Sequence, residues 1–102
     1  MTTNEMDSQR ALAGYAELIS RFVDGRISAQ EFESSYLRMF KNEKTRFPVD
    51  VFDLLDGLFA DVDEYVADPD LRNDAGGLDD EQLRTRARTA YDRLRSIRDS
   101  LD

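Results

Sequence analysis

The segment VDVFDLLDGLFADVDEYV, residues 49–66, decides the fold, because its apolar residues recur at three- and four-residue steps, as on one face of a helix. That face consists of Val51, Leu54, Leu55, Leu58, Phe59, Val62, Tyr65 and Val66. The opposite face carries Asp53, Asp56, Asp61, Asp63 and Glu64. Pro48 suits a first helical turn and Pro69 stops the pattern, so we predict a helix over 48–66. Gly57 weakens this helix, and close packing is the reason that the sequence suggests for it.

Two amphipathic helices are predicted before this segment. Residues 8–24 carry an apolar stripe, and Gly25 follows where a left-handed C-terminal cap is expected. Residues 28–44 begin with a capping box, in which the Ser28 hydroxyl and the Glu31 carboxylate accept each other's backbone N–H. Both helices have one apolar face, which can cover the face of the third.

A fourth helix is predicted over 79–101, with Asp79 as its N-cap. The segment 67–77 before it is rich in Asp, Asn and Gly and is expected to be a loop. Short connections between amphipathic helices favour neighbours that run in opposite directions. The chain is therefore predicted to be all-α, with residues 1–102 forming a single antiparallel four-helix bundle.

The composition limits the chemistry that the chain can perform. Its 102 residues include no Cys and no His, so disulfides, Cys-rich zinc sites and histidine general bases are excluded. No apolar run approaches the ~20 residues that cross a bilayer, and the N-terminus lacks the pattern of a secretory signal. We expect a cytoplasmic protein that is not an enzyme, with no catalytic residues, no cofactor and no metal.

The acidic residues do not form a calcium loop or a catalytic pair. The run that begins at Asp61 and continues with Asp63 resembles the start of an EF-hand, but Tyr65 occupies the third ligand position and the required Gly and final Glu are missing. A second run that begins at Asp68 has Arg72 at that position. Nothing in the sequence suggests a pocket that would raise the pKa of one carboxyl for acid–base catalysis.

Negative charge is concentrated in one part of the chain. Twelve of the 22 acidic residues fall between Asp50 and Glu81, where Arg72 is the single basic residue. The net charge of -8 therefore belongs mostly to this region. Concentrated negative charge favours a basic protein partner, and it argues against direct binding of nucleic acid or of a membrane surface.

Plainer interpretations stand beside this one. The acidic run can be a solubilising surface, and the Arg-rich last helix is better explained by a solvated, salt-bridged face than by a nucleic-acid site. Most aromatic residues fit the apolar stripes, whereas Phe47 and Phe52 fit them least, and Phe52 is expected to support the turn before the third helix. Tyr65, beside the acids, is the aromatic residue that we expect at an interface. A helical adaptor that binds another basic protein, or an accessory subunit of an enzyme, remains an alternative function.

Several short runs resemble the colicin D immunity family, the bacterial self-protective colicin-like immunity proteins. They appear in the family's order over residues 10 to 95. The runs are Phe22-Val23-Asp24-Gly25-Arg26, Ile27-Ser28-Ala29-Gln30-Glu31-Phe32-Glu33, Leu58-Phe59-Ala60-Asp61-Val62-Asp63-Glu64-Tyr65, then Asp68, Asp70 and Arg72, and finally Leu78-Asp79. The chain departs from the family pattern in the second half of the 28–44 helix and in the longer loop over 73–77.

The resemblance implies a four-helix protein that binds the C-terminal nuclease domain of a bacteriocin or contact-dependent inhibition toxin, one copy per toxin. In the colicin D case the toxin cleaves tRNA, and acidic side chains of the inhibitor occupy the positions of RNA phosphates. Asp63 and Asp68 fall where the family has its interface acids, with Asp61, Glu64 and Asp70 as neighbours. These five acids and Tyr65 are the predicted partner-binding residues.

Overall fold

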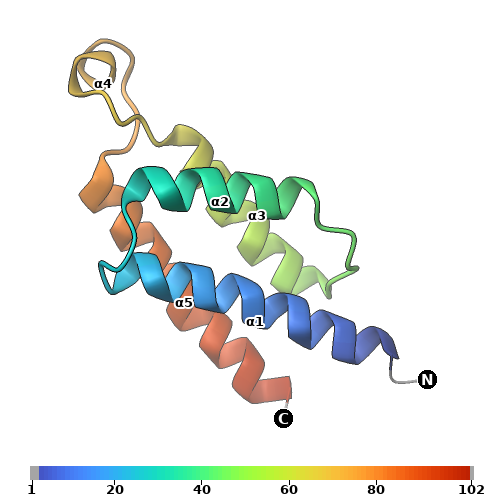
Figure 1. Cartoon of the computed structure of the whole chain (residues 1–102). Helices are drawn as coiled ribbons and strands as arrows, with labels where there is room; N and C mark the ends of the chain where they lie inside the picture. Colours follow the sequence, from blue (N-terminus) through green and yellow to red (C-terminus); the bar gives the residue numbers. More distant parts are fainter. Residues whose placement is uncertain (1–2, 102) are drawn as a thin grey trace.

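The computed structural model describes the backbone of residues 3–101 and the side chains of residues 8–72 and 76–99. Within this part of the chain the secondary structure is helical, as the sequence predicts, apart from one isolated bridge between Tyr65 and Leu78. The helices of Figure 1 are α1 (Thr3–Val23), α2 (Ala29–Lys41), α3 (Val49–Glu64), α4 (Pro69–Ala75) and α5 (Asp80–Leu101). None of the helices in the described range has the length and apolar character needed to cross a membrane.

The structure has five helices where the sequence predicts four, because α4 forms in the segment 67–77 that was expected to be a loop. A second difference is that α2 ends at Lys41 and not at residue 44. The side-chain amide of Asn42 donates a hydrogen bond to the Arg38 carbonyl oxygen over 2.9 Å. Asn side chains compete in this way with the helix backbone, which explains the earlier end of α2.

The apolar faces of α1, α2, α3 and α5 meet in one core, in which α1 and α3 each pack against both α2 and α5. The largest fully buried side chains include Tyr15, Phe22, Phe32, Tyr36, Leu55 and Leu58. Each of the buried Phe and Leu side chains stabilises the fold by roughly 1.5–3 kcal/mol relative to its exposed state. The Tyr36 hydroxyl also donates to the Leu55 carbonyl oxygen over 2.7 Å, which joins α2 to α3 inside the core.

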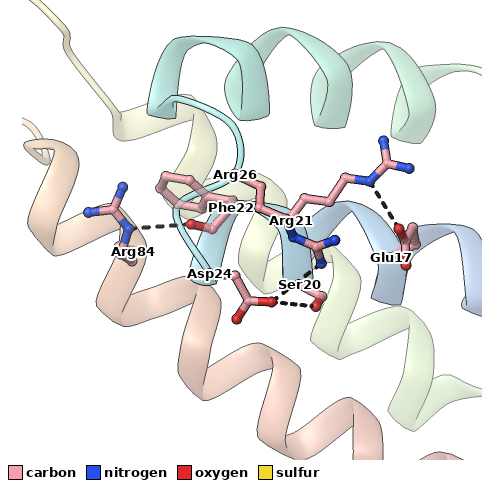
Figure 2. Close-up of polar contacts among 7 residues, drawn as sticks. All are labelled: Glu17, Ser20, Arg21, Phe22, Asp24, Arg26 and Arg84. Carbon is pink, nitrogen blue, oxygen red and sulfur yellow. Dashed lines mark hydrogen bonds and ion pairs between the residues drawn. The ribbon is translucent and has the colours of Figure 1, made fainter.

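The end of α1 is fixed to the beginning of α5 (Figure 2). Gly25 has a φ of 79°, and the N–H of Arg26 donates to the Arg21 carbonyl oxygen over 2.8 Å, as in a Schellman cap. Arg84 of α5 donates from Nε to the Phe22 carbonyl oxygen over 3.3 Å and places its guanidinium 5.0 Å from the centre of the Phe22 ring. The exposed pairs beside this turn are Arg21–Glu17, Ser20–Asp24 and Arg26–Asp24. The two contacts of Arg84 with Phe22 join the start of α5 to the end of α1.

The predicted N-caps of α2 and α5 are confirmed. The Ser28 hydroxyl oxygen accepts from the Glu31 N–H over 3.1 Å, and the hydroxyl itself approaches the Glu31 carboxylate. The reciprocal pattern of a complete capping box occurs instead at α5. There the Asp79 carboxylate accepts from the Gln82 N–H over 2.7 Å, and the Gln82 side-chain oxygen accepts from the Asp79 N–H over 3.0 Å.

Candidate functional site

The chain leaves the helical core after α3 and returns to it before α5 through a narrow neck. The Val66 N–H donates to the Leu78 carbonyl oxygen over 3.0 Å, and the Leu78 N–H donates to the Glu64 carbonyl oxygen over 2.9 Å. Gly77 has a φ of 113°, and a Cβ there would lie 2.7 Å from Val66 Cγ2. A residue without a side chain is therefore required where the two segments of the neck, before α4 and after it, approach each other.

Helix α4 stands on this neck and projects beyond the four longer helices (Figure 1). Among the described residues it packs against none of the other helices. The Asp68 carboxylate caps it by accepting the Asp70 N–H over 2.9 Å, and Pro69 occupies its first turn. Gly76, with a φ of 80°, ends it. Asp68 and Asp70 are thus held at the base of a short helical arm.

Four of the six residues predicted to bind a partner are exposed: Asp63, Glu64, Asp68 and Asp70. Asp63 and Glu64 come from the last turn of α3, and the other two come from the start of α4. Within the described part of the chain, no Lys or Arg forms an ion pair with any of the four. Apart from Asp68 Oδ1, which accepts the Asp70 N–H, their carboxylate oxygens have no hydrogen-bond partner among the described residues and can accept hydrogen bonds from Lys and Arg side chains of another protein.

Asp61 lies at the edge of this group and is less exposed. Its Oδ1 accepts from Arg86 Nη1 of α5 over 3.2 Å, and 22% of its side chain is accessible. Burial is the largest cause of a raised Asp61 pKa, Arg86 opposes the shift, and the neighbouring Glu64 adds to it. Asp61 is therefore already engaged within the chain by a weak, partly exposed ion pair.

Tyr65 does not present its ring to a partner, because only 5% of the residue is exposed. Its hydroxyl donates to Asp80 Oδ1 over 2.6 Å. Burial first, and then this hydrogen bond to Asp80, raise the pKa of the Tyr65 hydroxyl. The ring closes the core under the neck, and the hydroxyl fixes the first turn of α5. Tyr65 therefore contributes to the site by packing in the core and by positioning Asp80, and its ring is not exposed to a partner.

The sequence analysis missed Glu33 of α2 and Asp80 of α5. Burial raises the pKa of the Glu33 carboxyl first, and the negative charge of Asp63 raises it further. Glu33 and Asp80 also both act on the Tyr65 hydroxyl. No motif marks Glu33, because only the packing of α2 on α3 brings it within reach of the Asp63 charge. Asp80 lies in the first turn of α5, where an acidic residue is common, so its type does not mark it as part of a site.

We define the acidic surface as the carboxylates that four helices gather at this end of the molecule. Its members are Glu33, Asp63, Glu64, Asp68, Asp70 and Asp80. Within the described residues no three potential ligands come together closely enough to hold a metal ion. The geometry instead presents separate carboxylates over a broad area, which suits hydrogen bonding to several cationic side chains of a protein.

Comparison with known proteins agrees with the arrangement of runs noted in the sequence. The model of one protein family, described as bacterial self-protective colicin-like immunity, matches residues 11–94. This match covers α2, α3 and α4 completely and most of α1 and α5. A search of curated proteins finds no match. Because the family match covers most of the sequence, the chain belongs to the family of bacterial self-protective colicin-like immunity proteins.

Proposed function

We propose that the chain neutralises a nuclease toxin of the colicin D type, a tRNase, by covering the basic active site of the toxin with the acidic surface. The observation that carries the proposal is the exposure of four acids without partner cations in the described part of a colicin-like immunity protein: Asp63, Glu64, Asp68 and Asp70. Asp61 joins them by exchanging Arg86 for a cation of the toxin, and Tyr65 holds the neck beneath them.

The physical argument begins with the substrate of a nuclease. RNA carries one phosphate charge per nucleotide, so a cleft that binds it must be lined with Lys and Arg. Carboxylates placed over that cleft bind the same cations and occupy the same space. The acidic surface therefore inhibits by competition and needs no catalytic chemistry of its own. Charge complementarity also speeds the encounter of inhibitor and toxin.

Two carboxylates of the acidic surface repel each other in the free protein, and a cationic partner reduces this repulsion. Burial raises the pKa of the Glu33 carboxyl first, and repulsion by the negative charge of Asp63 raises it further in the free protein. Such a like-charge pair costs stability and contributes nothing to the helical core. A Lys or Arg placed between the two carboxylates converts the repulsion into attraction, which adds to the affinity for a basic partner.

The remaining parts of the proposal concern the setting of this interaction. The partner is the C-terminal nuclease domain of the cognate toxin, bound one copy to one, in the cytoplasm. The chain acts without a cofactor and without direct contact to nucleic acid or membrane, and it is not an enzyme. The four longer helices form an antiparallel bundle that presents the acidic surface at one end.

The test is protection by co-expression. The chain is produced in a sensitive bacterial host together with the nuclease domain of its cognate tRNase toxin, and survival and intact tRNA are measured. We expect full protection by the wild-type chain, and we expect equimolar purified chain to stop tRNA cleavage in vitro. Cleavage that continues at a molar excess of the chain would exclude this function.

A further inference from the structure

Three phenylalanines meet at the surface where α2 and α3 pack together. Phe52 and Phe59 of α3 both contact Phe40 of α2, with ring centres 6.2 Å and 5.0 Å apart. Phe52 is 47% exposed, and the other two rings are partly buried. We call these three residues the aromatic seam. Phe52 lies in the first turn of α3 and is exposed to solvent beside Phe40 near the end of α2.

The seam is held in place from inside the molecule. Phe40 stacks on Tyr36 with ring centres 6.1 Å apart and an angle of 16° between the planes. Tyr36 is fully buried, and its hydroxyl is bonded to the Leu55 carbonyl oxygen. Rings fixed in the free protein lose little conformational freedom on binding. The seam is therefore a preorganised apolar contact.

The seam is continuous with the acidic surface. Residues 52, 56, 59 and 63 follow one another along α3 at steps of four, three and four, so they share one edge of the helix. Asp56 lies between the two phenylalanines of α3, and Asp63 lies beyond the second. An aromatic centre bordered by charged residues is the usual arrangement of the core and rim of a protein interface.

We propose that the aromatic seam is the apolar anchor of the toxin interface, and that it receives an apolar side chain from a basic segment of the toxin. This inference rests on the proposed function and extends the same surface. Charge complementarity selects the occupant, because Asp56 and Asp63 border the seam along α3. A second copy of the chain, with its net charge of -8, would bring like charges together.

The seam and the acids then govern different steps of binding. Exposed charges at the rim act on the association rate and on its dependence on salt, whereas a desolvated central contact acts on the dissociation rate. Aromatic residues in central pockets contribute most of the affinity in many interfaces. The acidic surface attracts the toxin, and the seam keeps it bound.

The experiment measures binding of the catalytically inactivated nuclease domain of the cognate tRNase toxin to wild type and to Phe52→Ala. Because Phe52 is half exposed, the variant should retain the wild-type melting temperature. We expect about 30-fold weaker binding, mainly through faster dissociation. The factor should be the same at low and high salt, whereas the loss caused by Asp63→Asn should shrink as salt increases.

Two further variants complete the test. Phe52→Leu keeps an apolar side chain and should recover most of the affinity, and Tyr91→Ala removes a partly buried ring of α5 outside the seam and should bind as wild type. Wild-type affinity of Phe52→Ala would overturn the inference and leave the proposed function intact. A wild-type dimer that Phe52→Ala dissociates without any loss of toxin affinity would assign the seam to self-association. Absence of binding by the wild-type chain would overturn both proposals.

Discussion

Gly57 has free space at the position of a Cβ and Gly77 has none, so substitution by alanine should change the stability of the fold in opposite directions at the two positions. No atom outside its own helix backbone lies within 4 Å of a Cβ built at Gly57, so the close packing suggested by the sequence is wrong. At Gly77 a Cβ would lie 2.7 Å from Val66 Cγ2 and 2.9 Å from the Glu64 carbonyl oxygen, and φ is positive. One glycine only weakens a helix, and the other is required by the neck.

We predict that Gly57→Ala raises the free energy of unfolding by about 0.5–1 kcal/mol, because alanine favours the helix interior. Gly77→Ala should lower it, because the Cβ meets backbone and the positive φ is strained. Urea denaturation of both variants and wild type checks the two signs. Stabilisation by Gly77→Ala would mean that the neck does not close as described.

The carboxyl of Glu33 should titrate above its ordinary pKa of 4.5, because burial and then Asp63 raise it. A carboxyl whose pKa is raised by folding contributes stability that is complete below its unfolded pKa and is lost as pH rises through the folded value. Asp61, raised first by burial, acts in the same direction. Both groups therefore weaken the fold between mildly acidic and neutral pH.

NMR titration of the Glu33 carboxyl checks this account in wild type and in Asp63→Asn. The Glu33 pKa should fall in the variant but stay above 4.5, since burial is the larger cause. Glu33→Gln should raise the melting temperature at pH 7 and lose this advantage as the pH falls below 4.5. An unchanged Glu33 pKa in Asp63→Asn would show that the two carboxylates do not interact.

At the scale of elements, α4 is separable from the fold. It packs against none of the other helices in the described residues, and the neck beneath it is closed by the hydrogen bonds of Val66 and Leu78. Replacement of residues 68–76 by a short Gly/Ser linker should leave the melting temperature within a few degrees of wild type. The same variant should protect poorly against the toxin, because it lacks Asp68 and Asp70.

Circular dichroism during heating measures the first expectation, and the co-expression assay measures the second. A variant in which residues 68–76 are kept but Asp68 and Asp70 become Asn separates loss of charge from loss of the arm. Cooperative unfolding that disappears on deletion of the arm would show that α4 belongs to the folding unit.

Elements with a strong apolar period could be predicted from the sequence, and those set by local capping could not. The stripe through Leu55, Leu58 and Val62 placed α3 within about two residues, since burial of that face dominates its energy. Helix α4 has no apolar stripe and was missed, although Asp68 before it, Pro69 in its first turn and Gly76 after it are ordinary signals of a helix start and end. Its composition of Asp, Asn and Gly indicated a loop instead.

The part of the candidate site that comes from one continuous segment, residues 61–70, could be predicted from the sequence. Asp63 and Asp68 are exposed, as expected, because they lie opposite the apolar stripe or outside the helical core. Glu33 could not be found, since its approach to Asp63 depends on the register between α2 and α3. Tyr65 is predicted at an interface because it lies beside the acids, but its ring is buried where the bridge to Leu78 closes the neck.

At the scale of the whole molecule, binding of the toxin is proposed to depend on the position of the negative charge and not on the total net charge. The two sets of acids that can be compared are Asp63 with Asp68 at the acidic surface, and Asp92 with Asp99 on the exposed side of α5. Reversal to Lys at either pair changes the net charge equally. A general effect of charge on association would affect both double variants alike.

The most direct measurement is the dissociation constant of each double variant for the inactivated nuclease domain of the cognate toxin, at physiological salt. The account predicts at least about 100-fold weaker binding for Asp63→Lys with Asp68→Lys, because lost interface charge pairs cost about 2–5 kcal/mol each and the new cations face a basic cleft. Asp92→Lys with Asp99→Lys should bind within about threefold of wild type. Wild-type affinity of the Asp63 and Asp68 variant, with its fold intact, would contradict the central claim and place the contact elsewhere on the molecule.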